Sequence, residues 1–411
     1  MKKILILGGG FAGVEFYKQT HKKLHGSPDY LFHLVSRWNY FLFYPMLHEV
    51  ATGSVERAHI TQPLREIVDC CMERFSQTDV QRIDFEQKRV TTAQGEITYD
   101  YLVVALGVQP NFFSIPGADE HCVPFKSIAD AVHVRNHVIR HFESAAGEKN
   151  SEIRRQLLSF VIIGGGPTGV ELAGQLADLV HEEMRDLYPE IDHTEVKITL
   201  IDGGDRLLRQ HHAEMSSEAE RRLASMGVIV LKNCQVTKCE SHVVHVSNGE
   251  KIHGQLRVWT AGTQSALRGI ADETYLTERG GLKTRETLQL INHPEVFVLG
   301  DNMEIVEPRS MRVPQTAQAA AAAAAHAAQN FVGMIRHQPL LPFKFKSSGD
   351  IVPIGDWFAV AEVKGFRFFG PVAWIIRRTI FIQRLSSRMN RLKVTLDWAL
   401  HVFLRRDTSE L

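Results

Sequence analysis

KILILGGGFAG, residues 3–13, carries the strongest fold signal of this chain, and FVIIGGGPTG, residues 160–169, repeats its pattern. In both, a short apolar strand leads into a glycine-rich turn, and helical periodicity follows. The first glycine of such a turn permits the tight change of direction, the second lets the backbone approach a pyrophosphate, and the third lets the helix pack on the strand. One copy occurs by chance in many chains, whereas two in matching contexts predict two dinucleotide-binding domains of the α/β class.

The size and composition are those of an ordinary multidomain protein. The 411 residues are many for one domain and suit two or three. Lys plus Arg and Asp plus Glu both number 47, so no overall basic field predicts nucleic-acid binding. The five cysteines show no CxxC and no zinc-ligand spacing, so we predict free thiols in a reducing compartment and no metal site.

The apolar stretches are short. The N-terminal run ends at Leu7 in the glycine turn, which is too early for a signal peptide. The best later run covers only residues 368–376, whereas a bilayer span needs about 18 to 20 apolar residues. We therefore expect no signal peptide and no transmembrane helix.

Polar residues follow two further predicted strands. The strand at 31–35 ends where a dinucleotide site usually presents an acidic residue to the ribose, but this chain has Ser36 and Arg37. The strand at 296–299 ends in Gly300 and Asp301. At the ligand edge of a parallel sheet this carboxylate would accept hydrogen bonds from a polyol, although an ordinary turn aspartate gives the same pattern.

The strand at 196–201 ends in Asp202, where a carboxylate binds the ribose hydroxyls of NADH. Its charge would repel the 2′-phosphate of NADPH, so NADH is favoured, and only the nearby Arg206 argues for tolerance of a phosphate. Glu171 follows the second glycine turn, in the predicted first turn of the helix. An acidic residue there also suits the helix dipole, so Glu171 by itself does not define a site.

Several motifs in register carry a family resemblance. They are GGGFAG, NYFLFYPMLHEVATG, LVVALG followed by NFFSIPG, GGGPTGVELAG, VWTAG and VLGD. In this order they resemble the two-dinucleotide flavoprotein reductases of the pyridine nucleotide-disulfide reductase type. Within these, the chain is most similar to the type II NADH:quinone oxidoreductases, which are single-chain, non-pumping NADH dehydrogenases. The resemblance covers essentially the whole chain.

The resemblance implies that the first turn and Gly300-Asp301 bind FAD and that the second turn binds NADH. The implied FAD contacts are Gly8, Gly10, Phe11, Ala12, Gly13, Ser36, Arg37, Val80, Ala105, Leu106, Gly107, Gly300, Asp301, Thr316, Ala317 and Gln318. The implied NADH contacts are Gly164, Gly165, Gly166, Pro167, Thr168, Gly169, Glu171, Asp202, Ala261 and Gly262. Glu171, as a positioning residue near the nicotinamide, and Gln318 are the implied catalytic residues.

Residues 313–325 end in seven consecutive alanines and predict a helix that starts near Pro314. The resembling family has an AQxAxQ-like stretch here that lines its quinone pocket. Ala317-Gln318-Ala319-Ala320 matches the first half, but Ala322 stands where a second glutamine is usual. We expect N–H groups of Ala317 and Gln318 to stabilise negative charge on the reduced flavin. The alternative is a close-packed helix without a ligand.

Residues 364–411 hold ten basic and three acidic residues among aromatic and aliphatic ones. One helical face gathers Leu392, Leu396, Ala399, Leu400, Phe403 and Leu404. Amphipathic helices with tryptophan, phenylalanine and clustered arginine lie in membrane interfaces, and the resembling family uses this region as a monotopic foot. A dimerisation or core-covering helix pair is the alternative.

We therefore expect an FAD-binding domain at residues 1–112 and 265–330, an NADH-binding domain at 113–264 and a membrane-anchoring region at 331–411. The expected enzyme transfers hydride from NADH to FAD and then two electrons to a membrane quinone. It would lie on the cytoplasmic face of the inner or cell membrane, as a monomer or a homodimer. The alternatives are a sulfide:quinone-type or other NAD(P)H-flavin reductase and a non-catalytic NADH-binding redox sensor. The sulfide enzyme needs a redox cysteine pair near the flavin, and no cysteine follows Cys239.

Overall fold

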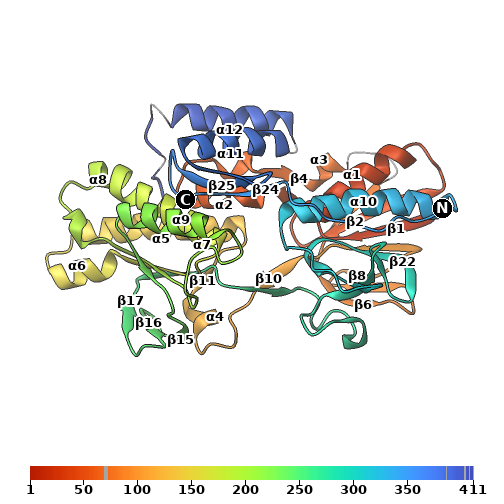
Figure 1. Ribbon diagram of the computed structural model, residues 1–411, viewed down its shortest axis with the longest axis horizontal. Helices are drawn as coiled ribbons and strands as arrows, with labels where there is room; N and C mark the ends of the chain where they lie inside the picture. The colour runs from red at the N-terminus through yellow and green to blue at the C-terminus, as the bar shows by residue number, and fades with distance from the viewer. Residues whose placement is uncertain (69–72, 386, 402–403, 407, 411) are drawn as a thin grey trace. The chain divides into compact units, whose positions relative to one another are not determined.

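The computed structural model describes residues 1–68, 73–385, 387–401, 404–406 and 408–410. The chain divides into two compact units, each assembled from three separate stretches (Figure 1). Unit 1 comprises Met1–Leu42, Thr61–Gln109 and Thr263–Ser347, and unit 2 comprises Phe43–Ile60, Pro110–Gly262 and Ser348–Leu411. Cys70, Cys71 and Phe403 lie outside the described residues.

Unit 1 contains a sheet with the strand order β23-β20-β21-β22-β9-β1-β2-β5. Its strand β1 (Lys2–Leu7) pairs in parallel with β9 (Tyr101–Val104) and with β2 (Tyr30–Ser36). Ile4 to Leu7 are completely buried, as expected for the continuous apolar run of a strand inside a parallel sheet. The other strands of this sheet are β5 (Glu73–Gln77), β20 (Leu282–Arg285), β21 (Gln289–Leu290), β22 (His293–Val298) and β23 (Met303–Glu307).

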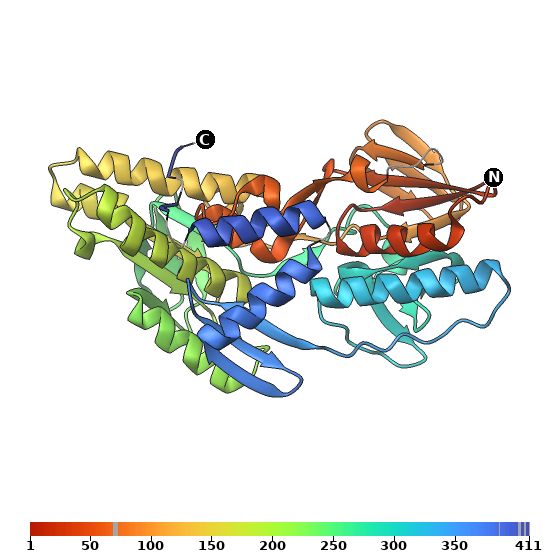
Figure 2. The same ribbon diagram turned by 90° about the horizontal axis from the view of Figure 1, so that it is seen from above.

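Two long helices of unit 1, α1 (Phe11–Leu24) and α10 (Ala317–Ile335), lie side by side in both views (Figures 1 and 2). The buried residues of α10 include Ala319, Ala320, Ala323, Ala324, Ala327 and Ala328, so the alanines allow close packing. Other strands and a short helix of this part of the chain are β3 (Tyr40–Leu42), β4 (Thr61–Pro63), α3 (Leu64–Ile67), β6 (Val80–Asp84), β7 (Arg89–Thr92), β8 (Gly95–Thr98) and β19 (Thr263–Ser265), and β10 (Val108–Pro110) ends at the boundary with unit 2.

Unit 2 repeats the arrangement with a five-stranded parallel sheet in the order β11-β18-β12-β13-β14. The second glycine turn joins the central strand β12 (Ser159–Ile163) to α7 (Pro167–Asp178). The other strands are β11 (Val123–Pro124), β13 (Lys197–Ile201), β14 (Val228–Leu231) and β18 (Leu256–Trp259). The prediction of two Rossmann-like dinucleotide-binding domains is thus confirmed, although the sheet of unit 1 also contains the antiparallel pairs β20–β21 and β21–β22.

Helices and smaller sheets complete unit 2. Its helices are α2 (Leu47–Ala51), α4 (Ala118–His121), α5 (Ile128–Ala146), α6 (Ser151–Leu157), α8 (Met184–Leu187), α9 (Ala213–Ser225), α11 (Pro371–Arg384) and α12 (Arg388–Leu400). Two antiparallel sheets hold β15 (Val236–Cys239), β16 (Val243–Val246) and β17 (Lys251–His253), and β24 (Gly349–Pro353), β25 (Ala359–Val363) and β26 (Phe366–Gly370).

The C-terminal region is integrated into unit 2 from residue 348 onward, whereas residues 331–347 belong to unit 1. Residues 43–60, which the sequence had placed with the FAD-binding stretch, also belong to unit 2. The physical reason is mutual packing, because the Phe43 ring lies edge-on to that of Phe381 in α11 with centroids 5.7 Å apart. Among the described residues no helix is both long and apolar enough to cross a membrane.

Candidate dinucleotide sites and a buried charged cluster

The first glycine turn is tightly packed except at its middle glycine. Gly8 has a φ of 111°, and a Cβ on it would collide with the Ala105 carbonyl oxygen. A Cβ on Gly13 would collide with the carbonyl oxygen of Gly8. A Cβ placed on Gly10 would meet no atom within 4 Å, so the backbone of Gly10 borders open space at the N-terminus of α1. This is the cradle that a pyrophosphate needs.

The second turn has the same geometry. Gly164 has a φ of 115°, and its Cβ would lie 2.7 Å from the Ala261 nitrogen. A Cβ on Gly169 would collide with the carbonyl oxygen of Gly164, whereas Gly166 again faces open space. Neither α1 nor α7 has a side chain that caps its first N–H groups, which remain available to an anion.

Asn302 links the other strand ends of the first site. Its side chain accepts a hydrogen bond from the Gly107 N–H and donates one to the Gly107 carbonyl oxygen, both 2.8 Å long. Asn302 is completely buried, and it holds the end of the β9 segment, with Ala105 and Leu106, beside Gly300 and Asp301. Sequence reasoning missed Asn302, because its position after Gly-Asp resembled an ordinary turn.

The alanine helix begins at Ala317, three residues later than predicted from Pro314. Thr316 is its N-cap, and the Thr316 hydroxyl accepts a hydrogen bond from the Ala319 N–H at 3.2 Å. This contact favours a start at Ala317 because the cap satisfies one of the unpaired N–H groups. The N–H groups of Ala317 and Gln318 are the two at the very tip of the helix.

Arg37 and Val80, two predicted FAD contacts, both belong to unit 1 and lie close to the same ion pair. The Arg37 guanidinium lies 2.5 Å from a carboxylate oxygen of Asp79, the residue just before Val80, and both charged side chains are more than half exposed. The ion pair therefore couples the end of β2 to the start of β6. Ser36 is buried, with its hydroxyl close to Gly9.

A cavity of about 610 Å³ opens at the second turn. Seven of the predicted NADH contacts line it, namely Gly164, Gly165, Gly166, Pro167, Asp202, Ala261 and Gly262. Thr168, Gly169 and Glu171 do not line it. Arg209 does, and its guanidinium lies 3.6 Å from Asp202. Arg206 instead donates hydrogen bonds to the carbonyl oxygens of His211 and Arg209, so Arg209 is the cation nearest the expected ribose carboxylate.

Asp202 also stabilises the backbone around the second glycine turn. One carboxylate oxygen accepts the Gly165 N–H and the other the Gly204 N–H, both at 2.7 Å. Each carboxylate oxygen offers two lone pairs, so both can still accept a ribose hydroxyl. The side chain therefore fixes the glycine turn and faces the cavity at once.

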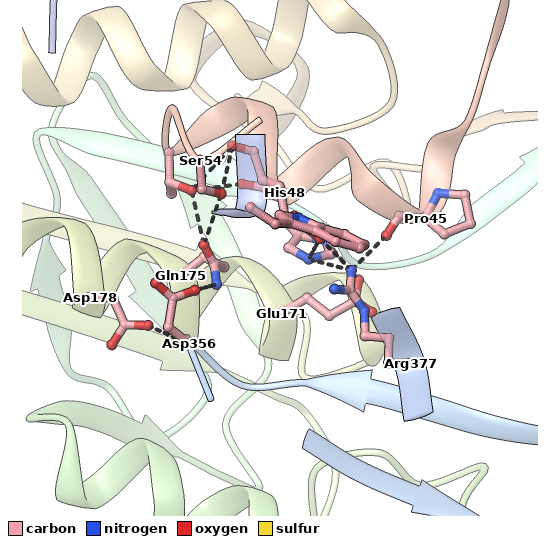
Figure 3. Close-up of polar contacts among 11 residues, drawn as sticks. Pro45, His48, Ser54, Glu171, Gln175, Asp178, Asp356 and Arg377 are labelled. Atoms are coloured by element: carbon pink, nitrogen blue, oxygen red, sulfur yellow. Dashed lines mark hydrogen bonds and ion pairs between the residues drawn. The ribbon is translucent and has the colours of Figure 1, made fainter. Parts of the chain in front are cut away.

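A buried charged cluster connects α7 with the C-terminal helices (Figure 3). We define the His48 cluster as His48, Glu49, Glu171, Arg377 and Trp398. His48 Nδ1 lies 3.3 Å from Glu171 Oε2, and Arg377 Nη2 lies 3.2 Å from His48 Nε2 and 2.7 Å from Glu49 Oε1. Trp398 Nε1 donates to Glu49 Oε2 at 2.7 Å. Glu171 stands in the second turn of α7, not the predicted first, so it faces α2 instead of capping the helix.

A second group of polar residues continues the cluster. Gln175 on α7 accepts a hydrogen bond from the Ser54 hydroxyl and donates one to Asp356. The Asp356 N–H donates to Asp178 (Figure 3). The Asp356 carboxylate also pairs with Arg406 at 2.7 Å. Burial, followed by the nearby Asp356 charge, raises the pKa of Asp178 to about 7.

Some arginines of the C-terminal segment, where we expected clustered arginine at a membrane interface, instead pack inside unit 2. Arg377 and Arg406 are buried and ion-paired, and Arg378 lies over the rings of Trp374 and Trp398. Sequence reasoning missed this inward role, because arginines in an amphipathic segment give no sign of buried partners far along the chain. The HEV run at residues 48–50, with two polar, ionisable residue types inside an aromatic and aliphatic stretch, was the available signal.

Two cysteines also meet. The thiols of Cys122 and Cys239 lie 3.5 Å apart in the core of unit 2, and both are free. Their separation of 117 residues explains why a search for CxxC spacing did not pair them.

Comparison with known proteins defines the class. Residues 2–324 match the family model described as pyridine nucleotide-disulphide oxidoreductase, and the chain belongs to this family. Among its relatives is the type II NADH:quinone oxidoreductase Ndh of Mycobacterium tuberculosis, 28% identical over 96% of this chain and 87% of that protein. The external alternative NAD(P)H-ubiquinone oxidoreductase B1 of Solanum tuberosum mitochondria is 34% identical over 75% of this chain, which spans only 56% of the plant protein.

Solved structures support the fold. NDH2 from Plasmodium falciparum in complex with NADH superposes with a TM-score of 0.91 at 21% identity, covering 99% of both chains. The sulfide:quinone oxidoreductase of Aquifex aeolicus gives a TM-score of 0.74 at 19% identity, covering 98% of this chain and 96% of that one. At such identities the likeness concerns the fold alone.

Proposed function

We propose that this chain is an FAD-dependent NADH:quinone oxidoreductase of the type II class. The observation that supports the proposal is the cavity at the second glycine turn, which is lined by seven of the ten predicted NADH contacts, Asp202 among them. At the first turn, a Cβ on Gly10 would meet no atom within 4 Å, which is consistent with a bound pyrophosphate of the flavin dinucleotide there. Relatives named as an NAD(P)H-ubiquinone oxidoreductase, a probable NADH dehydrogenase and a type II NADH:quinone oxidoreductase support the same chemistry.

In this proposal unit 1 binds FAD and unit 2 binds NADH. The Gly10 turn would hold the FAD pyrophosphate, Asp301 its ribitol, and the tip of α10 with Ala317 and Gln318 its ring. When bound, FAD accepts a hydride from NADH and passes two electrons to a quinone. Glu171 would stabilise the positive charge that the nicotinamide gains as the hydride leaves.

We further propose that α11 and α12 rest on a lipid surface at the cytoplasmic face of the cell or inner membrane. Leu392, Leu396 and Leu400 of α12 are each 50–55% exposed, whereas Val394 and Trp398 pack inward. The apolar face that the sequence predicted is therefore the outward one, and Ile375 of α11 is likewise 56% exposed. A second copy of the chain on this face would make a homodimer instead, and concentration-dependent mass measurements separate the two outcomes.

The decisive experiment reduces the purified holoenzyme anaerobically with NADH and then reoxidises it with a panel of quinones. We expect the flavin absorbance near its long-wavelength maximum to bleach with NADH and to return with ubiquinone or menaquinone analogues. Bleaching by millimolar sulfide would instead support the sulfide:quinone alternative. Bleaching by NADH without any return on addition of quinone would support an NADH-binding sensor.

A further inference from the structure

The contacts of His48 determine where its proton is. Arg377 Nη2 lies 3.2 Å from His48 Nε2, and a guanidinium can only donate hydrogen bonds. His48 Nε2 must therefore be the unprotonated acceptor, and the ring carries its single proton on Nδ1. That nitrogen lies 3.3 Å from Glu171 Oε2, which is within hydrogen-bonding reach of the carboxyl group.

Arg377 is fixed in the position that enforces this tautomer. Its side chain is only 2% exposed, pairs with Glu49 at 2.7 Å, and lies over the Phe381 ring with the guanidinium 4.5 Å from the ring centroid. Glu49 is fixed in turn by the Trp398 indole N–H. Burial alone would raise the pKa of Glu49, but the surrounding charges, led by Arg377, and the hydrogen bond from Trp398 together outweigh burial and hold that pKa below its usual value.

These groups come from four separate elements of unit 2. His48 and Glu49 belong to α2, Glu171 to α7, Arg377 to α11 and Trp398 to α12. Side-chain exposure is 2% for His48, 4% for Glu49 and 14% for Glu171, so bulk water does not replace these contacts. A hydrogen bond to a charged group in such surroundings is stronger than one in water.

We propose that His48 is a positioning residue, locked by Arg377 as a neutral Nδ1–H donor that orients the Glu171 carboxylate for NADH oxidation. The inference rests on the proposed function, in which Glu171 faces the nicotinamide. We do not expect His48 to transfer a proton. Its ring carries one proton, on Nδ1, and Nε2 accepts from the Arg377 guanidinium, so loss of that proton would leave an anionic ring. The C-terminal helix α11 thereby takes part in shaping the NADH site.

Two amide variants distinguish the contribution of His48 Nδ1 from that of His48 Nε2. In His48→Asn the amide nitrogen takes the place of Nδ1 and can still donate to Glu171, whereas in His48→Gln the amide reaches the Nε2 position and faces Arg377. We expect H48Q to slow anaerobic flavin reduction by NADH about tenfold or more, and H48N to recover most of that loss. Equal rates for H48Q and wild type, or equal losses for both variants, would overturn the proposal.

A binding measurement adds a readout that does not depend on turnover. Because Glu171 would favour the positively charged nicotinamide, H48Q should weaken binding of NAD⁺ to the holoenzyme several-fold more than binding of NADH, and H48N should not. A merely structural role would weaken both alike. Histidine ¹⁵N spectra of wild type should show an Nδ1–H ring signal that is absent from H48N, and a ring protonated on Nε2 instead would contradict the proposal.

A double-mutant cycle with Glu171→Gln tests the connection to Glu171, because effects of His48 that do not pass through Glu171 cancel in the cycle. H48Q should cause little further loss in the E171Q background, whereas a full additional loss would show that His48 acts elsewhere. Failure of wild type itself to reduce its flavin with NADH would refute the proposed function. Normal reduction by wild type with indistinguishable His48 variants would refute only the role of His48.

Discussion

Single residues at the strand ends decide which nucleotide fits. Asp202 accepts two backbone N–H groups and faces the cavity, and Arg209 stands 3.6 Å from it. We expect Asp202→Asn to raise the KM for NADH about tenfold and to raise the relative kcat/KM for NADPH, since the repulsion of a 2′-phosphate disappears. Steady-state kinetics with both nucleotides measure the ratio. Asp205→Asn, exposed and outside the cavity lining, is the matched control and should leave the ratio unchanged.

The glycines of the first turn differ in what a methyl group would meet. Gly13→Ala would collide with the Gly8 carbonyl oxygen, so we expect a clear loss of folding stability. Gly10→Ala meets no protein atom and has an ordinary extended backbone, so the fold should form while FAD retention drops. Thermal unfolding and the ratio of flavin to protein absorbance separate the two effects. Full FAD occupancy in G10A would refute the proposed cradle.

The sequence predicted those site residues that belong to a motif contiguous with its strand. The glycine turns, Asp202 and Ser36 occupy the predicted strand ends, because a motif and its strand are contiguous in the chain. Asn302 and Arg209 could not be predicted in the same way. Their roles depend on side-chain contacts that are set only when the turns have closed, and no spacing rule connects Asn302 to Gly107.

At the level of elements, α12 presents two chemically different faces. Leu392 and Leu396 point outward, so replacing both by serine should leave the melting temperature nearly unchanged but lower cosedimentation with anionic lipid vesicles severalfold. Ile153→Ser with Ile229→Ser, which removes two comparably exposed apolar side chains elsewhere in unit 2, is the control. Equal vesicle binding by the leucine variant and wild type would contradict a lipid-facing α12.

The inner face of α12 is expected to matter for stability instead. Trp398→Phe removes the indole N–H that Glu49 accepts at 2.7 Å and leaves a buried carboxylate oxygen without that donor. We expect a loss of about 1–3 kcal/mol in the free energy of unfolding. Denaturant titration measures it, and Trp357→Phe at a 53% exposed tryptophan should cost much less.

The folding stability of the whole molecule should depend on pH through the protonation of Asp178. Its folded-state pKa of about 7 exceeds the ordinary value of 3.8, because the carboxyl is buried near Asp356. The folded state therefore holds a proton that the unfolded chain releases between about pH 4 and 7, and stability falls as pH rises through that window.

Asp178→Asn removes this penalty. The variant should be more stable than wild type at pH 8, by an amount on the order of a few kcal/mol, and the advantage should vanish toward pH 4. Melting temperatures across this range test the expectation, with the exposed Asp119→Asn as control. An advantage that did not change with pH would show that the carboxyl is not the cause.

The division of the chain was harder to predict than its sheets. Apolar strands and turns give local signals, whereas residues 43–60 join unit 2 through contacts with stretches more than 300 positions away, such as His48 with Arg377. A linear reading assigned this segment to its sequence neighbours and treated the tail as an appendage.

The ion pairs that tie the tail into unit 2 bear on how the protein should be handled. Removing residues after about 370 to obtain a better-behaved preparation would strip Glu49 of Arg377 and Asp356 of Arg406, leaving uncompensated buried charges. Such a truncated form would be a damaged protein and would not report on the intact one. Detergent-free preparations are better sought by changing the outward leucines of α12 and keeping every residue of its inner face.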